Sequence, residues 1–410
     1  MTNLTPPHRI ELLAPAGNME KLETVLNYGA DAIYMAGKEF SLRNFAGNFS
    51  IEEMGTAIRL THAAGAKAYA AVNIFARNRD LAPIEAYLQR LAQLAPDALI
   101  VADPAVVQLA RKVAPGMPLH LSTQANTTNA AAARFWHAQG VQRINAAREL
   151  SLAEIDEIAG ACPVEIEAFV HGAMCISYSG RCLLSNFMAL RPSNQGMCCQ
   201  PCRFRYAVVE ETRPGQYFPI EEDTSGAYLF NSKDLCMLAH LPEMIQSGIR
   251  ALKIEGRMKS IHYAATSVKI YREAIDRYYA APEQFTPAAY WQAELDKITS
   301  RGYCTGFYLG DPHQTVPSYA APLAGDYPLA AKVLAAAGTN KALVEVRNQL
   351  RVGDAVEIVH RKGPSIPDTV QEIIDSDGVS LPKAQPGSQV TLLLGNDCER
   401  LDLLRRRPCA

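Results

Sequence analysis

The chain has 410 residues, 48% of them hydrophobic, which is enough apolar sequence to bury the cores of two or three folded domains. Its formal net charge of -2 excludes binding to nucleic acid through overall charge, so an RNA partner would need a local basic face. No apolar run is long enough to cross a membrane, and the first residues lack a signal-peptide pattern. We therefore expect a cytoplasmic protein that has no membrane partner.

Short β-rich segments alternate with helical segments over the first 260 residues. Several helical segments end in Gly or Pro, as helices commonly do. This alternation predicts an α/β fold, a closed (β/α)8 TIM-like barrel, with an open doubly wound sheet as the alternative. The eight predicted strands cover residues 11–16, 31–36, 67–73, 97–102, 118–123, 141–146, 164–170 and 251–256.

Polar residues follow several of these strands, among them Asn73, Gln124, Arg148 and His171. Barrel enzymes carry their active sites on the loops that follow the strands. Such residues also cap helices and end strands for structural reasons, so each one alone is weak evidence. Their coincidence predicts a functional site at this face of the barrel.

The seventh unit of the barrel is much longer than the others, because about eighty residues separate its strand from the next one. Loops of that length in a compact domain are usually functional or disordered. We therefore expect a barrel domain over residues 1–310 with a cysteine-rich insertion at 171–248, and a linker at 311–328. A small antiparallel β-barrel domain is expected over 329–410; the three arginines at 405–407 near its end are interpreted as a local basic patch or a solvated tail.

Five of the ten cysteines lie within residues 171–203, with the spacing Cys175-x6-Cys182-x15-Cys198-x3-Cys202 and Cys199 alongside. A reducing compartment disfavours disulfides, and a nucleophilic cysteine activated by His171 would leave the others unexplained. Structural zinc prefers cysteine pairs two to four residues apart, so the wide first spacing favours an iron-sulfur cluster over zinc without excluding either. Cys236 has helical spacing among apolar neighbours, which predicts a role in core packing.

Three longer motifs resemble a known family, the collagenase-like peptidases: "EAFVHGAMCISYSGRCLLS" (167–185), "NQGMCCQPCR" (194–203) and "LKIEGRMKSIHY" (252–263). Despite the family's name, its better understood members resemble proteins that insert oxygen into tRNA, ribosomal RNA or ubiquinone precursors without using O2. The length and the C-terminal segment are similar to the tRNA branch. The resemblance therefore implies formation of 5-hydroxyuridine at the wobble position of tRNA.

The resemblance also implies a 4Fe-4S cluster on Cys175, Cys182, Cys198 and Cys202, and prephenate as a co-substrate. Cys199 stands where the family usually has another residue, so the choice between Cys198 and Cys199 stays open. The implied partners are the anticodon loop of tRNA and an electron-transfer or accessory protein, and the small β domain is expected to grip the anticodon stem.

Candidate roles follow from this resemblance and from residue chemistry. Proton transfer is assigned to Glu167, His171 and Glu255. Substrate binding is assigned to Asn73, Gln124, Arg203, Lys253 and Arg257. An ion pair between Glu255 and Arg257 that closes the barrel is the structural alternative.

Two other functions stay open. One is a peptidase, although the chain has neither an HExxH helix nor a Gly-x-Ser-x-Gly elbow. The other is a zinc-stabilised RNA-binding module without catalytic activity.

Overall fold

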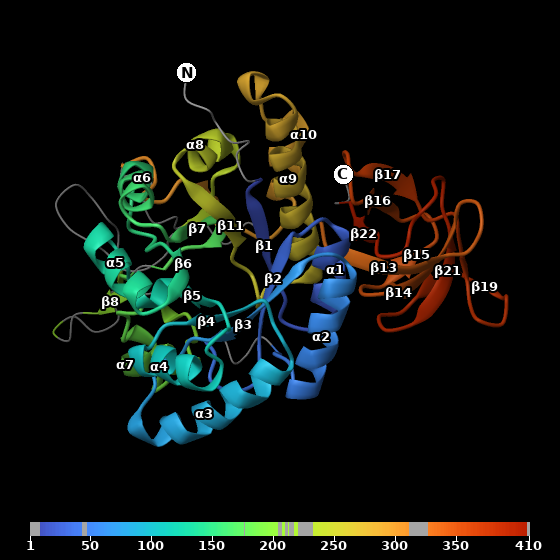
Figure 1. Cartoon of the computed structure of the whole chain (residues 1–410). Helices are drawn as coiled ribbons and strands as arrows, with labels where there is room; N and C mark the ends of the chain where they lie inside the picture. Colours follow the sequence, from blue (N-terminus) through green and yellow to red (C-terminus); the bar gives the residue numbers. More distant parts are fainter. Residues whose placement is uncertain are drawn as a thin grey trace.

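The computed structural model describes residues 9–42, 47–175, 177–203, 207–209, 212, 217–219, 233–310 and 327–407. Its N-terminal part is a closed barrel of eight parallel strands, because β11 pairs with both β1 and β7 (Figure 1). The predicted TIM-like barrel is confirmed. The barrel strands are β1 (Glu11–Pro15), β2 (Ala32–Ala36), β3 (Lys67–Val72), β4 (Ala98–Val101), β5 (Leu119–Leu121), β6 (Val141–Asn145), β7 (Glu165–Ala173) and β11 (Ile249–Ile254).

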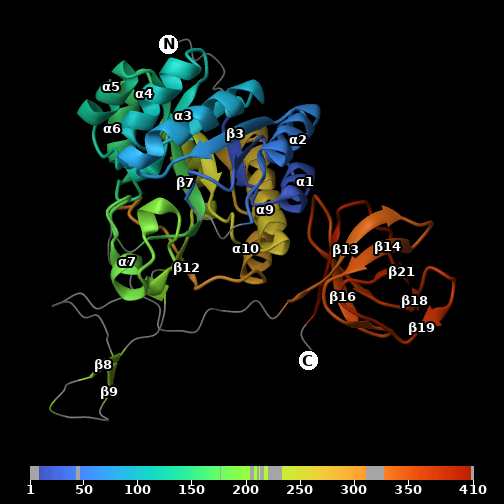
Figure 2. The same ribbon diagram turned by 90° about the horizontal axis from the view of Figure 1, so that it is seen from below.

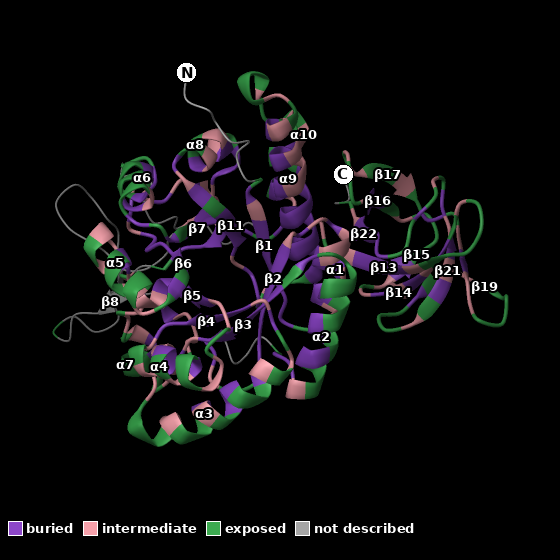
Figure 3. Ribbon diagram, in the orientation of Figure 1, coloured by how far each residue is buried: buried purple, intermediate pink, exposed green. Residues whose placement is uncertain are grey.

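Helices cover the outside of the barrel, and several of them begin at a residue whose side chain caps the N-terminus. The Asn18 side chain accepts from Lys21 N at the start of α1, and Ser50 and Glu53 form a capping box on α2. Figure 3 shows the barrel strands buried and the outer faces of α2 and α3 exposed. The helices are α1 (Met19–Asn27), α2 (Ile51–Ala63), α3 (Asn78–Gln93), α4 (Pro104–Val113), α5 (Ala130–Ala138), α6 (Leu152–Ala161), α7 (Leu184–Ala189), α8 (Leu241–Gln246), α9 (Ile261–Ala280) and α10 (Ala289–Asp296).

The insertion adds α7 and three short strands: β8 (Ala207–Val209), β9 (Tyr217–Pro219) and β10 (Asp234–Cys236). A further short strand, β12 (Tyr303–Cys304), follows α10 in the chain and pairs with β10. Strand β10 runs antiparallel to the end of β7 and extends the sheet beyond the barrel. The helical spacing around Cys236 was therefore misleading, because this residue ends a strand; it still packs against the barrel core.

The C-terminal domain is an antiparallel sheet of eight strands that curls around its own hydrophobic core. The sheet begins with β17 and ends with β19, and a separate two-stranded pairing joins β15 to β20. Most of the predicted linker, 311–326, lies outside the described residues. The strands are β13 (Leu329–Ala336), β14 (Lys341–Val346), β15 (Leu350–Arg351), β16 (Ala355–Val359), β17 (Ile366–Thr369), β18 (Glu372–Ile374), β19 (Ser380–Leu381), β20 (Lys383–Ala384), β21 (Gln389–Leu393) and β22 (Leu403–Arg406).

This domain lies against α1, α9 and α10 of the barrel (Figures 1 and 2). Tyr28, at the C-terminal end of α1, donates its hydroxyl to the carbonyl of Val359 at 2.6 Å. Arg405 is fully buried and forms ion pairs with Glu294 of α10 at 2.7 Å and with Glu357 of β16 at 2.6 Å. The interpretation of 405–407 as a basic patch or a solvated tail is therefore wrong for Arg405, whose charge joins the two domains.

Cys162, Cys304 and Cys398 are buried, as expected of small core residues, and Cys409 lies outside the described residues. No disulfide joins the described cysteines. Within the ranges given above, no helix is both long and apolar enough to span a membrane.

Candidate functional site

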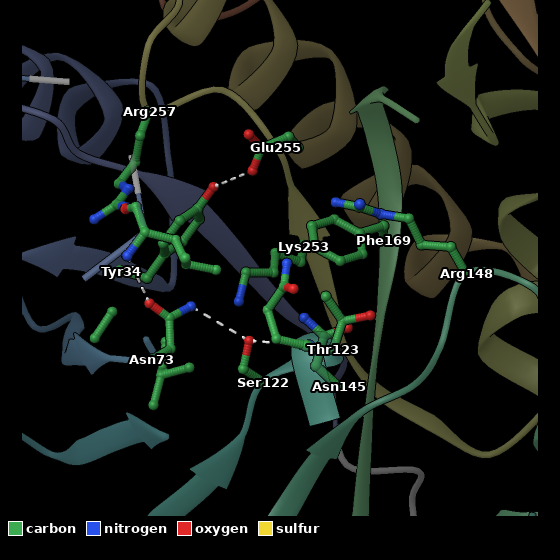
Figure 4. Close-up of a pocket in the computed structure, with 14 residues that line it drawn as sticks. Tyr34, Asn73, Ser122, Thr123, Asn145, Arg148, Phe169, Lys253, Glu255 and Arg257 are labelled. Atoms are coloured by element: carbon green, nitrogen blue, oxygen red, sulfur yellow. Dashed lines mark hydrogen bonds between the residues drawn. The ribbon is translucent and has the colours of Figure 1, made fainter. Parts of the chain in front are cut away.

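A pocket opens at the ends of the barrel strands, and we call it the mouth pocket. Five of the predicted site residues line it: Asn73, Gln124, Lys253, Glu255 and Arg257. The complete lining is Tyr34, Leu42, Ala71, Asn73, Ile100, Ser122, Thr123, Gln124, Asn145, Arg148, Phe169, Lys253, Glu255 and Arg257 (Figure 4). The barrel therefore brings together polar residues from the ends of five strands, β2, β3, β5, β6 and β11.

Lys253 is a cation on the floor of this pocket, held by a buried carboxylate. Its Nζ donates to Glu167 Oε1 at 2.7 Å and lies 4.5 Å from the ring centroid of Tyr34. Asn145 Nδ2 donates to the same Glu167 oxygen at 2.9 Å. Glu167 is only 2% exposed and is not part of the pocket lining, so it contacts the site through Lys253 and Asn145.

Tyr34 and Asn73 fix the opposite wall. The Tyr34 hydroxyl lies 3.0 Å from the carbonyl of Ile254 and 3.3 Å from Glu255 Oε2, and burial raises its pKa well above the ordinary value. The phenol is therefore a hydrogen-bond donor at neutral pH. Asn73 Oδ1 accepts from Leu42 N at 3.1 Å and its Nδ2 donates to Ser122 Oγ at 3.3 Å.

Arg257 is buried and its guanidinium donates to the carbonyl of Leu42, while its own carbonyl accepts from Lys21 Nζ at 2.8 Å. These bonds connect the loop after β11 with the segments that follow β1 and β2. Gly172 permits the close approach of β7 to the backbone just after β11: it has φ +107°, and a Cβ there would lie 2.5 Å from the Glu255 carbonyl oxygen. The "HG" and "EGR" motifs thus position the mouth pocket.

A second pocket, the cysteine pocket, adjoins the first. Its lining includes all four predicted metal ligands, Cys175, Cys182, Cys198 and Cys202, but not Cys199. Leu42 and Gln124 line both pockets and form part of the wall between them. The complete lining is Leu42, Gln124, Met174, Cys175, Ser177, Tyr178, Ser179, Gly180, Cys182, Ser193, Asn194, Cys198, Gln200 and Cys202.

Arg148, from the loop after β6, connects the two pockets. Its Nη1 lies 3.2 Å from Cys175 Sγ, and its guanidinium carbon lies 4.0 Å from the centroid of the Phe169 ring. The neighbouring Glu149 accepts from Ser179 N at 2.9 Å. The loop after β6 thus holds the start of the cysteine segment beside the barrel mouth.

Gly180 brings the cysteine segment against the loop after β5. Its φ is +73°, and a Cβ there would lie 2.2 Å from the Gln124 carbonyl oxygen. Any larger residue would push the cysteines away from the barrel, so the glycine of "SYSGRC" keeps the two pockets in contact.

The neighbouring cysteines of the doublet differ in their surroundings. Cys198 Sγ faces the cysteine pocket and accepts from Gln200 N at 3.4 Å. Cys199 instead lies beside α7, with its Sγ 3.3 Å from Ser185 Oγ and its backbone N–H donating to the same hydroxyl at 3.2 Å. Cys198, and not Cys199, therefore lines the same pocket as the other three predicted ligands.

His171 lies away from both pockets. It is 1% exposed and packs against Tyr263, Tyr271 and Tyr303, with ring centroids 5.4 to 5.7 Å apart. Burial lowers its pKa to about 4, so the imidazole is neutral at pH 7. Its catalytic role stays a prediction, and its position favours a structural one.

The remaining predicted residue, Arg203, has a side chain outside the described part of the structure. Sequence reasoning gave no role to Tyr34, Arg148 or Phe169, although it named Arg148 among the polar residues that follow barrel strands. Arg148 carried a usable signal, since it is polar and follows a predicted strand, but nothing in the spacing showed that it reaches Cys175.

Comparison with known proteins agrees with this architecture. Residues 17–317 match peptidase family U32 and residues 326–405 match the peptidase family U32 C-terminal domain. The chain is 41% identical to tRNA hydroxylation protein P1 of Bacillus subtilis over 383 residues, which are 93% of this chain and 90% of the relative. It is 35% identical to tRNA hydroxylation protein P of Escherichia coli, covering 94% of this chain and 93% of that one.

A third relative carries a different name. The Porphyromonas gingivalis protein named collagenase is 31% identical over 312 residues, covering 73% of each chain. Relatives with different printed names thus match most of this chain. The barrel with its cysteine-rich insertion matches the family over residues 17–317, and the curled β domain matches the C-terminal domain of the same family. This chain therefore belongs to peptidase family U32.

Proposed function

We propose that this protein hydroxylates tRNA, converting the wobble uridine to 5-hydroxyuridine without O2. The observation that carries this proposal is the contact between a four-cysteine pocket and a polar pocket at the barrel mouth. Relatives that match nearly the whole chain are named tRNA hydroxylation proteins, which supports the choice of substrate.

The four thiols of the cysteine pocket fit the ligand set of a 4Fe-4S cluster, which needs four thiolates spread around a cube of atoms. In the described ranges, no three His, Cys, Asp or Glu side chains are arranged to hold a single metal ion. The choice of the cluster over zinc rests on the wide spacing between Cys175 and Cys182 in the sequence. Bound there, the cluster would supply one-electron chemistry beside the mouth pocket.

The mouth pocket is the proposed site for the base. A base must leave its stack to be modified, and an anticodon loop presents bases that are already largely unpaired. Asn73 and Gln124 offer amide groups for the edge of a uracil, and Tyr34 and Phe169 offer aromatic faces.

Prephenate is proposed as the co-substrate. It carries carboxylates, for which the cations of the mouth pocket, Lys253, Arg257 and Arg148, are suitable partners. Glu255 lines the pocket and is the better placed of the predicted proton-transfer groups, because Glu167 is not part of the lining and is bonded to Lys253.

The proposal is tested by mass spectrometry of tRNA from a strain that lacks this gene. We expect the one-oxygen mass increment on wobble uridine to disappear, and to return when the gene is restored. Anaerobically purified protein should contain about four irons per chain. Unchanged tRNA, with altered ribosomal RNA or quinone intermediates instead, would identify another substrate; a colourless protein that cleaves collagen would favour the peptidase.

Lys253→Met is expected to lower tRNA hydroxylation by about 100-fold or more, because the cation on the pocket floor is lost. It should also cost about 1 to 3 kcal/mol of stability, since Glu167 loses its closest charged partner. The double variant Lys253→Met/Glu167→Gln separates these effects: stability should partly recover in urea unfolding, while activity stays low. Recovery of activity in the double variant would show that Lys253 acts only by neutralising Glu167.

A further inference from the structure

The segment between Cys175 and Cys202 exposes an unusual number of large apolar side chains. Phe187 is 78% exposed and Leu190 is 86% exposed. We call the set the α7 rim; it consists of Tyr178, Leu183, Phe187, Met188, Leu190 and Met197. Exposed apolar patches of this kind on a folded protein usually mark an interaction surface.

The rim belongs to a structured segment that is bonded to the rest of the site. Ser193 Oγ donates to the carbonyl of Cys182 at 2.6 Å, and the carbonyl of Asn194 accepts from Phe75 N at 3.2 Å. Tyr178 lines the cysteine pocket while it stays 60% exposed. The apolar side chains are thus presented outward at the edge of the candidate site, and Figure 2 shows α7 apart from helices α3 to α6.

Leu190 is exposed to water and also has an unfavourable backbone conformation. Its φ is +52°, in the left-handed region that favours glycine or asparagine, and its N–H donates to the carbonyl of Asn186 at 2.9 Å. Stability alone would favour a small or polar residue at this helix end. An exposed leucine there is explained more simply by contact with a partner.

The charge of the same segment indicates the nature of that partner. The chain contains 42 Asp and Glu residues among 410, so about four are expected in a stretch of 42 residues, yet residues 168–209 contain none. The stretch contains four arginines, of which Arg181 is exposed and Arg191 is half-buried on the rim side. A local positive field in a chain of net charge -2 is complementary to a polyanion.

From these observations we propose that the α7 rim is a docking surface for the unpaired bases of an RNA loop, whose phosphates are neutralised by Arg181 and Arg191. The inference rests on the proposed function and adds the surface that presents the RNA to the site. Single-stranded bases stack on exposed aromatic and apolar side chains beside basic ones. A base that enters the mouth pocket must leave its loop neighbours at the edge of the site, where the rim lies.

The test is the affinity of the full-length protein for a fluorescently labelled anticodon stem-loop, measured by anisotropy. Phe187→Ala and Leu190→Asn should each weaken binding, by about tenfold for Phe187→Ala. Asparagine tolerates the left-handed conformation of position 190, so folding is preserved. Arg181→Gln should weaken binding and reduce the dependence of log Kd on log salt by about one unit.

Helix α5 provides matched controls. Phe135 is 55% exposed and the exposed Arg134 precedes it, so Phe135→Ala and Arg134→Gln make the same chemical changes on another face. Both should leave the affinity unchanged.

Equal affinities for rim and control variants would overturn the inference. So would a wild-type dimer that Phe187→Ala converts to a monomer, because the rim would then bind a second copy. If the wild-type protein neither binds the stem-loop nor supports 5-hydroxyuridine in cells, the proposed function itself has failed. If hydroxylation is normal but the rim variants bind the stem-loop as tightly as the wild type, only the proposed role of the α7 rim is excluded.

Discussion

Cys198→Ala is expected to lose bound iron and to lower tRNA hydroxylation by at least about 100-fold, whereas Cys199→Ala keeps both. Cys198 Sγ faces the pocket that Cys175, Cys182 and Cys202 also line, while Cys199 is bonded to Ser185 beside α7. Removing one of four thiolates leaves a cluster site incomplete. Iron content after anaerobic purification and the yield of 5-hydroxyuridine measure the two effects separately.

The adjacent residue is the matched control, since both variants remove one thiol from the same turn. Cys199→Ala should cost only about 1 kcal/mol, because it loses a single hydrogen bond to Ser185. Circular dichroism should be unchanged in both variants, because the doublet is not part of the barrel core. Iron retained by Cys198→Ala and lost from Cys199→Ala would reverse the assignment.

Much of the fold was predictable from local patterns. All eight barrel strands lie within about two residues of the segments predicted from the βα alternation, apart from the longer C-terminal end of β7. Strands β10 and β12 were missed because their residues lie in segments without strand alternation and pair with chain far away in sequence. Pairing of that kind depends on tertiary contacts that local propensity does not contain.

The part of the candidate site that could be predicted consists of residues that the closed barrel itself brings together. Asn73, Gln124 and Lys253 are far apart in sequence but follow or end barrel strands, so closure of the barrel brings them together. The separation of Cys198 from Cys199 was not predictable, because spacing does not tell which neighbour turns toward the pocket. Nor was the contact of Arg148 with Cys175, which depends on how two loops pack.

Arg405→Met is expected to destabilise the protein by about 3 to 5 kcal/mol, the largest effect on stability that we predict. Arg405 is fully buried, and its Nη2 lies within 2.9 Å of both Glu294 oxygens and 2.6 Å from Glu357 Oε2. Methionine fills a similar volume but leaves two buried carboxylates facing each other, with Lys297 as their nearest remaining cation at 3.2 and 2.9 Å. Calorimetry measures the change.

The loss of stability caused by Arg405→Met should become smaller as pH falls. Burial by itself would raise the pKa of Glu294, but the charges of Arg405 and Lys297 outweigh it and lower the pKa below its ordinary value of 4.5. A depressed carboxyl pKa contributes stability above the unfolded-state pKa and loses it as pH falls through the folded-state value. The difference between wild type and Arg405→Met should therefore shrink below about pH 4.5, where the carboxylates take up protons.

Arg407→Met is the matched control, because Arg407 is 47% exposed and its Nε lies 3.9 Å from Glu357, so the change should stay within about 0.5 kcal/mol. Equal effects at 405 and 407 would contradict the buried network. Because Arg405 joins β22 to α10, its loss should also split calorimetric unfolding into two transitions, one for each domain. The tRNA affinity of this variant, measured below the first transition, then reports how far RNA binding depends on a β domain held firmly against the barrel.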